Sequence, residues 1–123
     1  MENHLNHVYS CIDKRKEEII EIGDHIYANP ETGYKEFKTS SYLSEKLKDI
    51  GFSEEKLKGI GFSVQEFGNI PGLKITLDTG REGPGLAVIG ELDAVICSDH
   101  PHKDQATDAV HACGHNIQKK GRL

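Results

Sequence analysis

The chain has 123 residues, of which 36% are hydrophobic and 28% are charged. This length allows one domain at most, residues 1–123, and the composition is that of a globular protein rather than a disordered tail. No stretch approaches the roughly 18 apolar residues that a membrane-spanning helix needs. Fifteen Lys and Arg against 20 Asp and Glu give a net charge of −5 without a basic stripe. We therefore expect neither a membrane nor nucleic acid as a partner.

The cysteines and the N-terminal segment indicate a compartment. The first residues are polar and lack the basic start and apolar run of a signal peptide. Three cysteines are too few, and odd in number, for a disulfide framework: Cys11, Cys97 and Cys113. We therefore expect a reducing, cytoplasmic location, where a cysteine flanked by histidines is a candidate metal ligand.

Helical periodicity opens the chain. Apolar residues recur at steps of three, four and seven over residues 3–28, and Arg15 occupies the one missing position. Asn29 and Pro30 should end this helix, because a residue before proline is pushed out of the helical region. After a turn at residues 30–34, a second helix is predicted over 37–49.

A near repeat follows the second helix. Residues 45–53 and 55–63 share most of their sequence at an offset of ten, which favours a local duplication over a structural repeat. Gly51 in the first copy is predicted to cap the second helix. The second copy would form an extra helical turn or a loop.

Strand patterns begin at residue 62. Residues 62–67 read as a strand, and strict alternation over 73–78 predicts a half-buried one. A turn is expected at 79–84, and the continuous apolar run 86–89 predicts a strand buried on both faces. The polar stretch 98–108 should be a loop after that strand. The sequence therefore predicts an α/β fold with two N-terminal helices packed on a mixed sheet.

The motif His-Ala-Cys-Gly-His at 111–115 is the strongest chemical signal. Cys113 and His115 can meet one metal ion if the backbone bends at Gly114. A thiolate favours zinc or cobalt over magnesium or calcium. A small polar loop with an incidental cysteine stays open as the alternative, because no further ligand pair closes a four-ligand site.

Carboxylates and histidines near this motif form two further candidates. Asp93 follows the predicted strand 86–89 and could orient a ligand histidine or bind a metal, with Glu91 on the same face. Two strand-end acids facing solvent are the alternative. His100 and His102 could be a second ligand cluster or part of a solvated loop.

Three segments resemble the amidohydrolase branch of the aminoacylase and carboxypeptidase-type metallopeptidases: residues 90–94, the loop with His100 and Asp104, and residues 109–118. Aminobenzoyl-glutamate hydrolases and indoleacetyl-amino-acid hydrolases belong to this branch. Residues 26–34 resemble the opening helix and turn of the same family. The resemblance implies that residues 1–123 are the N-terminal, incomplete part of a zinc-peptidase-like three-layer catalytic domain.

The resemblance also implies residue roles. Cys113 and His115 correspond to ligands of a two-metal site that holds zinc, or manganese or cobalt, and Asp93 corresponds to a catalytic aspartate near the metals. Such enzymes cleave an amide bond of an N-acyl amino acid or dipeptide, with a glutamate as general base. A metal contact by Glu91 stays open, since many relatives outside this branch have histidine there.

The resemblance implies that much of such an enzyme, including the general base and lid domain, is absent from this chain. We therefore expect a truncated amidohydrolase that is inactive alone and has an exposed sheet edge suited to homo-oligomers. Two other function classes stay open. One is a non-catalytic, self-associating interaction module. The other is a small structural zinc protein using residues 111–115 with His100 or His102.

Overall fold

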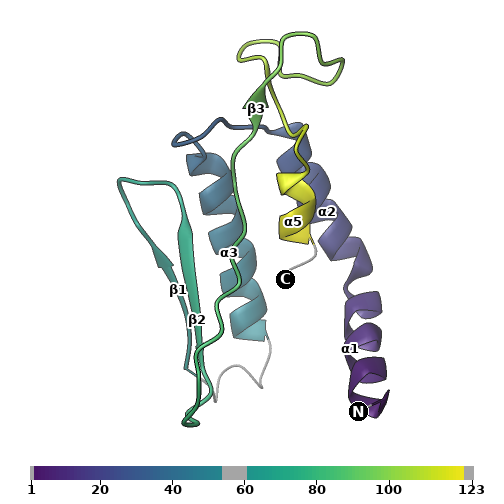
Figure 1. Cartoon of the computed structure of the whole chain (residues 1–123), viewed down its shortest axis with the longest axis vertical. Coiled ribbons are helices and arrows are strands. Elements are labelled where there is room, and N and C mark those ends of the chain that lie inside the picture. Colours follow the sequence, from purple (N-terminus) through teal and green to yellow (C-terminus); the bar gives the residue numbers. More distant parts are fainter. Residues whose placement is uncertain (1, 54–60, 121–123) are drawn as a thin grey trace.

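The computed structural model describes residues 2–53 and 61–120. Three helices come first along the chain, four strands follow, and a last helix comes after them (Figure 1): α1 (Glu2–Lys14), α2 (Lys16–Ala28), α3 (Phe37–Ser53), β1 (Gly61–Glu66), β2 (Leu73–Asp78), β3 (Val95–Ile96), β4 (Ala109–Val110) and α5 (His115–Lys120). The α/β class predicted from the sequence is confirmed. Among the described residues, no helix combines the length and apolar character required to cross a membrane.

The predicted helix over 3–28 is divided at Arg15. Arg15 has φ −104° and ψ 8°, and its N–H donates to Ile12 O at 3.1 Å, which is a tight turn rather than helix. Arg15 stands where the apolar pattern lacks an apolar side chain, and its guanidinium lies 3.7 Å from Glu18. The chain changes direction at this point (Figure 1). The prediction of one continuous helix was therefore wrong, although both halves are helical.

The core lies between α2 and α3. Ile22, Ile26 and Leu43 are at most 5% exposed. Four partly buried residues pack against them: Tyr42, Leu47, Leu73 and Leu92. These contacts join the two helices to the start of β2 and to the chain segment before β3.

The two core helices, α2 and α3, end in different ways. α2 stops at Ala28 as predicted, and the Asn29 side chain donates to His25 O at 2.8 Å. α3 continues through Gly51 to Ser53, so the predicted cap at Gly51 was wrong. Glycine permits a left-handed cap but does not impose one. Of the second repeat copy, residues 61–63 begin β1, and the rest lies outside the described residues.

The strands predicted at 62–67 and 73–78 form an antiparallel pair. Gly61 pairs with Asp78 and Glu66 with Leu73. Lys48 on α3 holds Glu66 on β1 at 2.8 Å, and the Ser44 hydroxyl donates to the same carboxylate. β2 is less buried than predicted, because Ile75 and Leu77 are 45% and 49% exposed. Its contact with the core is made by Leu73, at its start.

The buried strand predicted at 86–89 is absent from the described fold. Leu86, Val88 and Ile89 are 93%, 66% and 78% exposed, and the segment belongs to no strand. β3 and β4 instead form a second antiparallel pair, and a single parallel bridge joins Thr32 to Ala94. The strands therefore form two separate pairs rather than one mixed sheet, because the segment between them makes no ladder.

Candidate functional site

His115, the first residue of α5, lies between two carboxylates. Its Nδ1 is 2.9 Å from the backbone oxygen of Asp93 and 3.0 Å from Asp93 Oδ1. Its Nε2 is 3.1 Å from Glu91 Oε2. The His115 side chain is 15% exposed, whereas those of Asp93 and Glu91 are 36% and 59% exposed. The site therefore opens to solvent on its Glu91 side.

The partners of His115 determine which nitrogen carries its proton. The backbone oxygen and ionised carboxylate of Asp93 only accept hydrogen bonds, so Nδ1 donates to them. A neutral imidazole then has a lone pair on Nε2, facing the carboxylate of Glu91. Two lone pairs 3.1 Å apart repel each other unless a proton or a metal ion lies between them. A carboxylate or carbonyl holding the other nitrogen is the usual support of a metal-binding histidine.

Glu31 holds the backbone next to Asp93 in place. Its backbone oxygen accepts the Ala94 N–H at 2.8 Å, next to Asp93. Its carboxylate accepts the backbone N–H groups of Lys38 and Thr39 at 3.2 and 2.7 Å, at the first turn of α3. These donors have no partner within a helix, so the carboxylate caps α3 from a distance. Sequence reasoning missed this role, because Glu31 lies outside the local capping pattern.

Gly114 turns the chain into α5. Its φ is 78°, a left-handed conformation that side chains disfavour, and it supplies the bend expected between Cys113 and His115. Cys113 is exposed in the turn between β4 and α5, and His111, at the other end of the motif, is 5% exposed. The motif therefore has one buried histidine, one histidine in the carboxylate cluster and one solvent-facing thiol.

The described residues bring together no group of three or more His, Cys, Asp or Glu side chains that could hold a metal ion. At His115 the two carboxylates contact different nitrogens of the ring, Asp93 at Nδ1 and Glu91 at Nε2. The structure places both Asp93 and Glu91 in contact with His115, and their roles at a metal stay predictions. Cys113 is not part of any such group within the described part of the chain.

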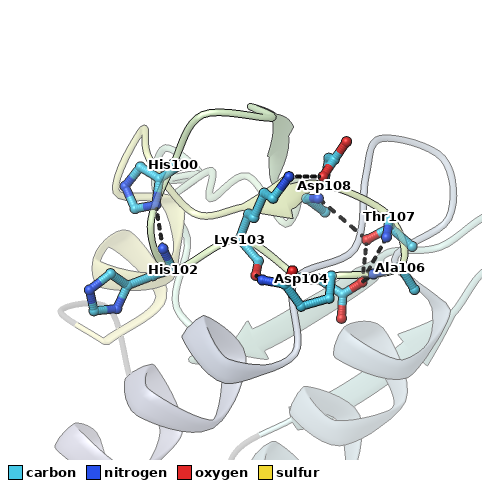
Figure 2. Close-up of polar contacts among 9 residues, drawn as sticks. His100, His102, Lys103, Asp104, Ala106, Thr107 and Asp108 are labelled. Atoms are coloured by element: carbon cyan, nitrogen blue, oxygen red, sulfur yellow. Dashed lines mark hydrogen bonds and ion pairs between the residues drawn. The ribbon is translucent and has the colours of Figure 1, made fainter.

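The loop after β3 is organised by its own hydrogen bonds (Figure 2). Asp104 Oδ1 accepts from the backbone N–H and hydroxyl of Thr107, each at 2.8 Å, and from the Ala106 N–H at 3.0 Å. These bonds, first that of the Thr107 hydroxyl, lower the pKa of Asp104 below its ordinary value. Lys103 pairs with Asp108 at 2.5 Å. Asp104 and Asp108 are thus engaged within the loop.

His100 and His102 lie side by side in the same loop. His100 Nδ1 accepts a hydrogen bond from the His102 backbone N–H at 3.1 Å (Figure 2). The two rings lie edge to face, with their centroids 5.9 Å apart. An open pocket of about 550 Å³ separates this loop from the end of α2 and is lined by Tyr27, His102 and their neighbours. Neither Asp93 nor His115 lines that pocket. The second ligand cluster considered for His100 and His102 stays a prediction.

Comparison with known proteins shows a consistent group of relatives. The chain is 28% identical to a component of the p-aminobenzoyl-glutamate hydrolase of Escherichia coli, over 95% of its own length and 24% of that protein. It is 28% identical to hippurate hydrolase of Campylobacter jejuni and 31% identical to thermostable carboxypeptidase 2 of Saccharolobus solfataricus, over 80% of this chain in each case and 24% and 23% of those proteins.

The predicted resemblance to amidohydrolases is confirmed. Two of these relatives are hydrolases by name, of p-aminobenzoyl-glutamate and of hippurate, and the third is a carboxypeptidase by name. The chain spans about a quarter of the length of the curated relatives that it matches. No family model matches the chain, and no solved structure gives a significant match.

Proposed function

We propose that this chain forms part of a metal-dependent amidohydrolase that cleaves an amide bond of an N-acyl amino acid or dipeptide-like substrate. The observation that carries the proposal is the position of His115, with Asp93 at one ring nitrogen and Glu91 at the other. The similarity to proteins named for hydrolysis of acylated amino acids supports the substrate class. The enzyme would act in the cytoplasm on a small molecule.

The donors around His115 suit a divalent metal ion. Nε2 and Glu91 Oε2 lie 3.1 Å apart and offer an imidazole and a carboxylate, and Cys113 offers a thiolate two residues before the histidine. Zinc, manganese and cobalt accept such donors, and the sulfur favours zinc or cobalt. His115 and Glu91 would hold the ion in our proposal, and the exposed Cys113 side chain would have to turn toward them, because the described fold does not bring the three together. Two ions would occupy the complete enzyme.

The metal would polarise the amide carbonyl and activate a bound water. The residues of this chain have separate tasks around it. Asp93 holds Nδ1 of His115 and thereby keeps the lone pair of Nε2 directed away from itself. Glu31, through Ala94 and the first turn of α3, fixes the backbone next to Asp93. We propose that Asp93 contributes to catalysis by orienting His115.

Cobalt binding tests this proposal on the chain itself. In a Cys11→Ser background, which removes the thiol on α1, Co²⁺ should produce a thiolate-to-metal absorption band. Cys113→Ser should abolish the band, and His115→Ala should weaken Co²⁺ binding by about tenfold or more, the scale on which disturbed ligand sets lose affinity. Cys97→Ser is the matched control and should keep the band. A band that persists in Cys113→Ser would contradict the proposed ligand set.

Self-association is a second candidate function, favoured by the segment 86–89. Its side chains are strand-forming and exposed, with Leu86 at 93%. An exposed segment of strand-forming residues can pair with copies of itself, and a charge within it blocks the pairing. Leu86→Lys should therefore lower the oligomeric fraction on size-exclusion chromatography, and Ser98→Lys, the same charge in a loop, should not. A parent chain that elutes as a monomer would exclude this candidate.

A further inference from the structure

The exposed face of α1 carries an imidazole and a thiol one turn apart. His7 Nε2 lies 3.8 Å from Cys11 Sγ, and both residues are exposed. Residues four apart on a helix are surface neighbours, so the helix itself sets this spacing. The pair is remote in sequence from Asp93 and His115, and neither the proposed function nor the resemblance assigns it a role.

The separation of the two atoms fits a shared metal ion. Zinc binds thiolate sulfur at about 2.3 Å and imidazole nitrogen at about 2.0–2.1 Å, and a tetrahedral angle then places sulfur and nitrogen about 3.6 Å apart. The observed 3.8 Å differs from that value by a small rotation of either side chain. We propose that His7 Nε2 and Cys11 Sγ together bind a zinc-like divalent ion within one chain.

Binding at this pair requires a defined exchange of ligands. The Cys11 thiol releases its proton to solvent, one metal–sulfur and one metal–nitrogen bond form, and waters leave the hydrated ion until two remain in the tetrahedral shell. Two protein donors do not make a closed structural site, which takes four. Water therefore completes the coordination, in agreement with the absence of any three-residue ligand group among the described residues. The ion is exchangeable rather than a permanent part of the fold.

The pair would link metal binding to the stability of α1. Leu5, Val8 and Ile12 on this helix are 48–52% exposed, so packing contributes little to α1. Isolated helices of about 12–15 residues are marginal in water, and α1 has 13. A metal ion bonded to both residue 7 and residue 11 spans one turn of α1 and holds that turn in the helical conformation. Metal should therefore increase the helix content of the chain.

Two readouts on one set of variants test the proposal. The background is Cys97→Ser with Cys113→Ser, which leaves Cys11 as the single thiol and removes the thiolate of the proposed catalytic site. Co²⁺ should give a thiolate-to-metal absorption band at one ion per chain and a gain of helical signal in far-ultraviolet circular dichroism. His7→Ala should lose the helical gain and most of the band at the same Co²⁺ concentration. His4→Ala, an exposed histidine one turn earlier, should keep both.

The proposal would be overturned by the absence of a band in the background chain, by equal bands with and without His7, or by loss of both signals in His4→Ala. One ion shared by two chains would also overturn it. Because Cys113 is absent from this background, failure here leaves the proposed amidohydrolase site untouched. Loss of cobalt binding at Cys113 in the Cys11→Ser chain would likewise leave this proposal standing.

Discussion

The helices α1 and α2 have equal length and follow one another in the chain, yet only one of them is built into the core. α2 buries Ile22 and Ile26 to 1% exposure or less, whereas the apolar residues of α1 are about half exposed. The difference lies in their neighbours. α2 lies beside α3 and α5, and α1 extends away from them past the turn at Arg15 (Figure 1). The helical spacing of apolar residues thus predicts a helix, but the elements packed against that helix determine how much it stabilises the fold.

Among substitutions that test this difference between α1 and α2, the largest loss of stability is expected at Ile26. Ile26→Ala removes a side chain that is 1% exposed in the core and should lower the free energy of unfolding by about 2–5 kcal/mol. Val8→Ala is the matched control on α1, where the side chain is 50% exposed, and should change stability by no more than about 0.5 kcal/mol. Urea unfolding of both variants measures the two values. Equal losses would mean that α1 is packed as tightly as α2.

A smaller effect is expected where α3 meets β1. The Lys48 side chain, and next the Ser44 hydroxyl, hold the pKa of Glu66 below its ordinary value. Lys48→Met should raise the pKa of Glu66 toward that value, as seen in NMR titration of its carboxyl group. The pKa of Asp104, lowered by its own loop, should stay unchanged and serves as the internal reference.

The sign of the corresponding pH effect follows from that depressed pKa. A carboxylate with a lower pKa in the folded state contributes stability above its unfolded pKa and loses it as the pH falls through the folded pKa. The parent chain should therefore lose slightly more stability than Lys48→Met on acidification below the ordinary glutamate range. A Glu66 carboxyl that titrates identically in both chains would show that the bridge between α3 and β1 does not form in solution.

Sequence patterns predicted the local elements better than their assembly. The helical periods and the strands at 62–67 and 73–78 follow from side-chain alternation and are present. The run 86–89 was predicted to be buried because it is apolar, but burial requires neighbouring strands, and the described fold supplies none. The break at Arg15 was visible as a gap in the pattern, whereas the extension of α3 past Gly51 was not, since glycine fits both outcomes.

The candidate site was predictable in part. Asp93, considered as a group that could orient a ligand histidine, contacts His115, which lies 22 residues further along the chain. A metal contact by Glu91 was left open, because the position differs from relatives outside the branch, and its contact with the second ring nitrogen of His115 was not predicted. No local pattern predicted the role of Glu31, since its carboxylate accepts from backbone N–H groups seven and eight residues further along the chain, at the N-terminus of α3. Long-range side-chain contacts of this kind depend on the fold and not on local spacing.

NMR of the His115 ring nitrogens during Zn²⁺ addition tests the central claim most directly. We predict that Nδ1 carries a proton throughout, because Asp93 accepts from it, and that the Nε2 signal shifts as the metal binds beside Glu91. His25, which stacks on Tyr42, is the reference and should not respond. Metal binding at Nδ1, or a His115 ring that does not respond to Zn²⁺ at all, would contradict the proposed metal site.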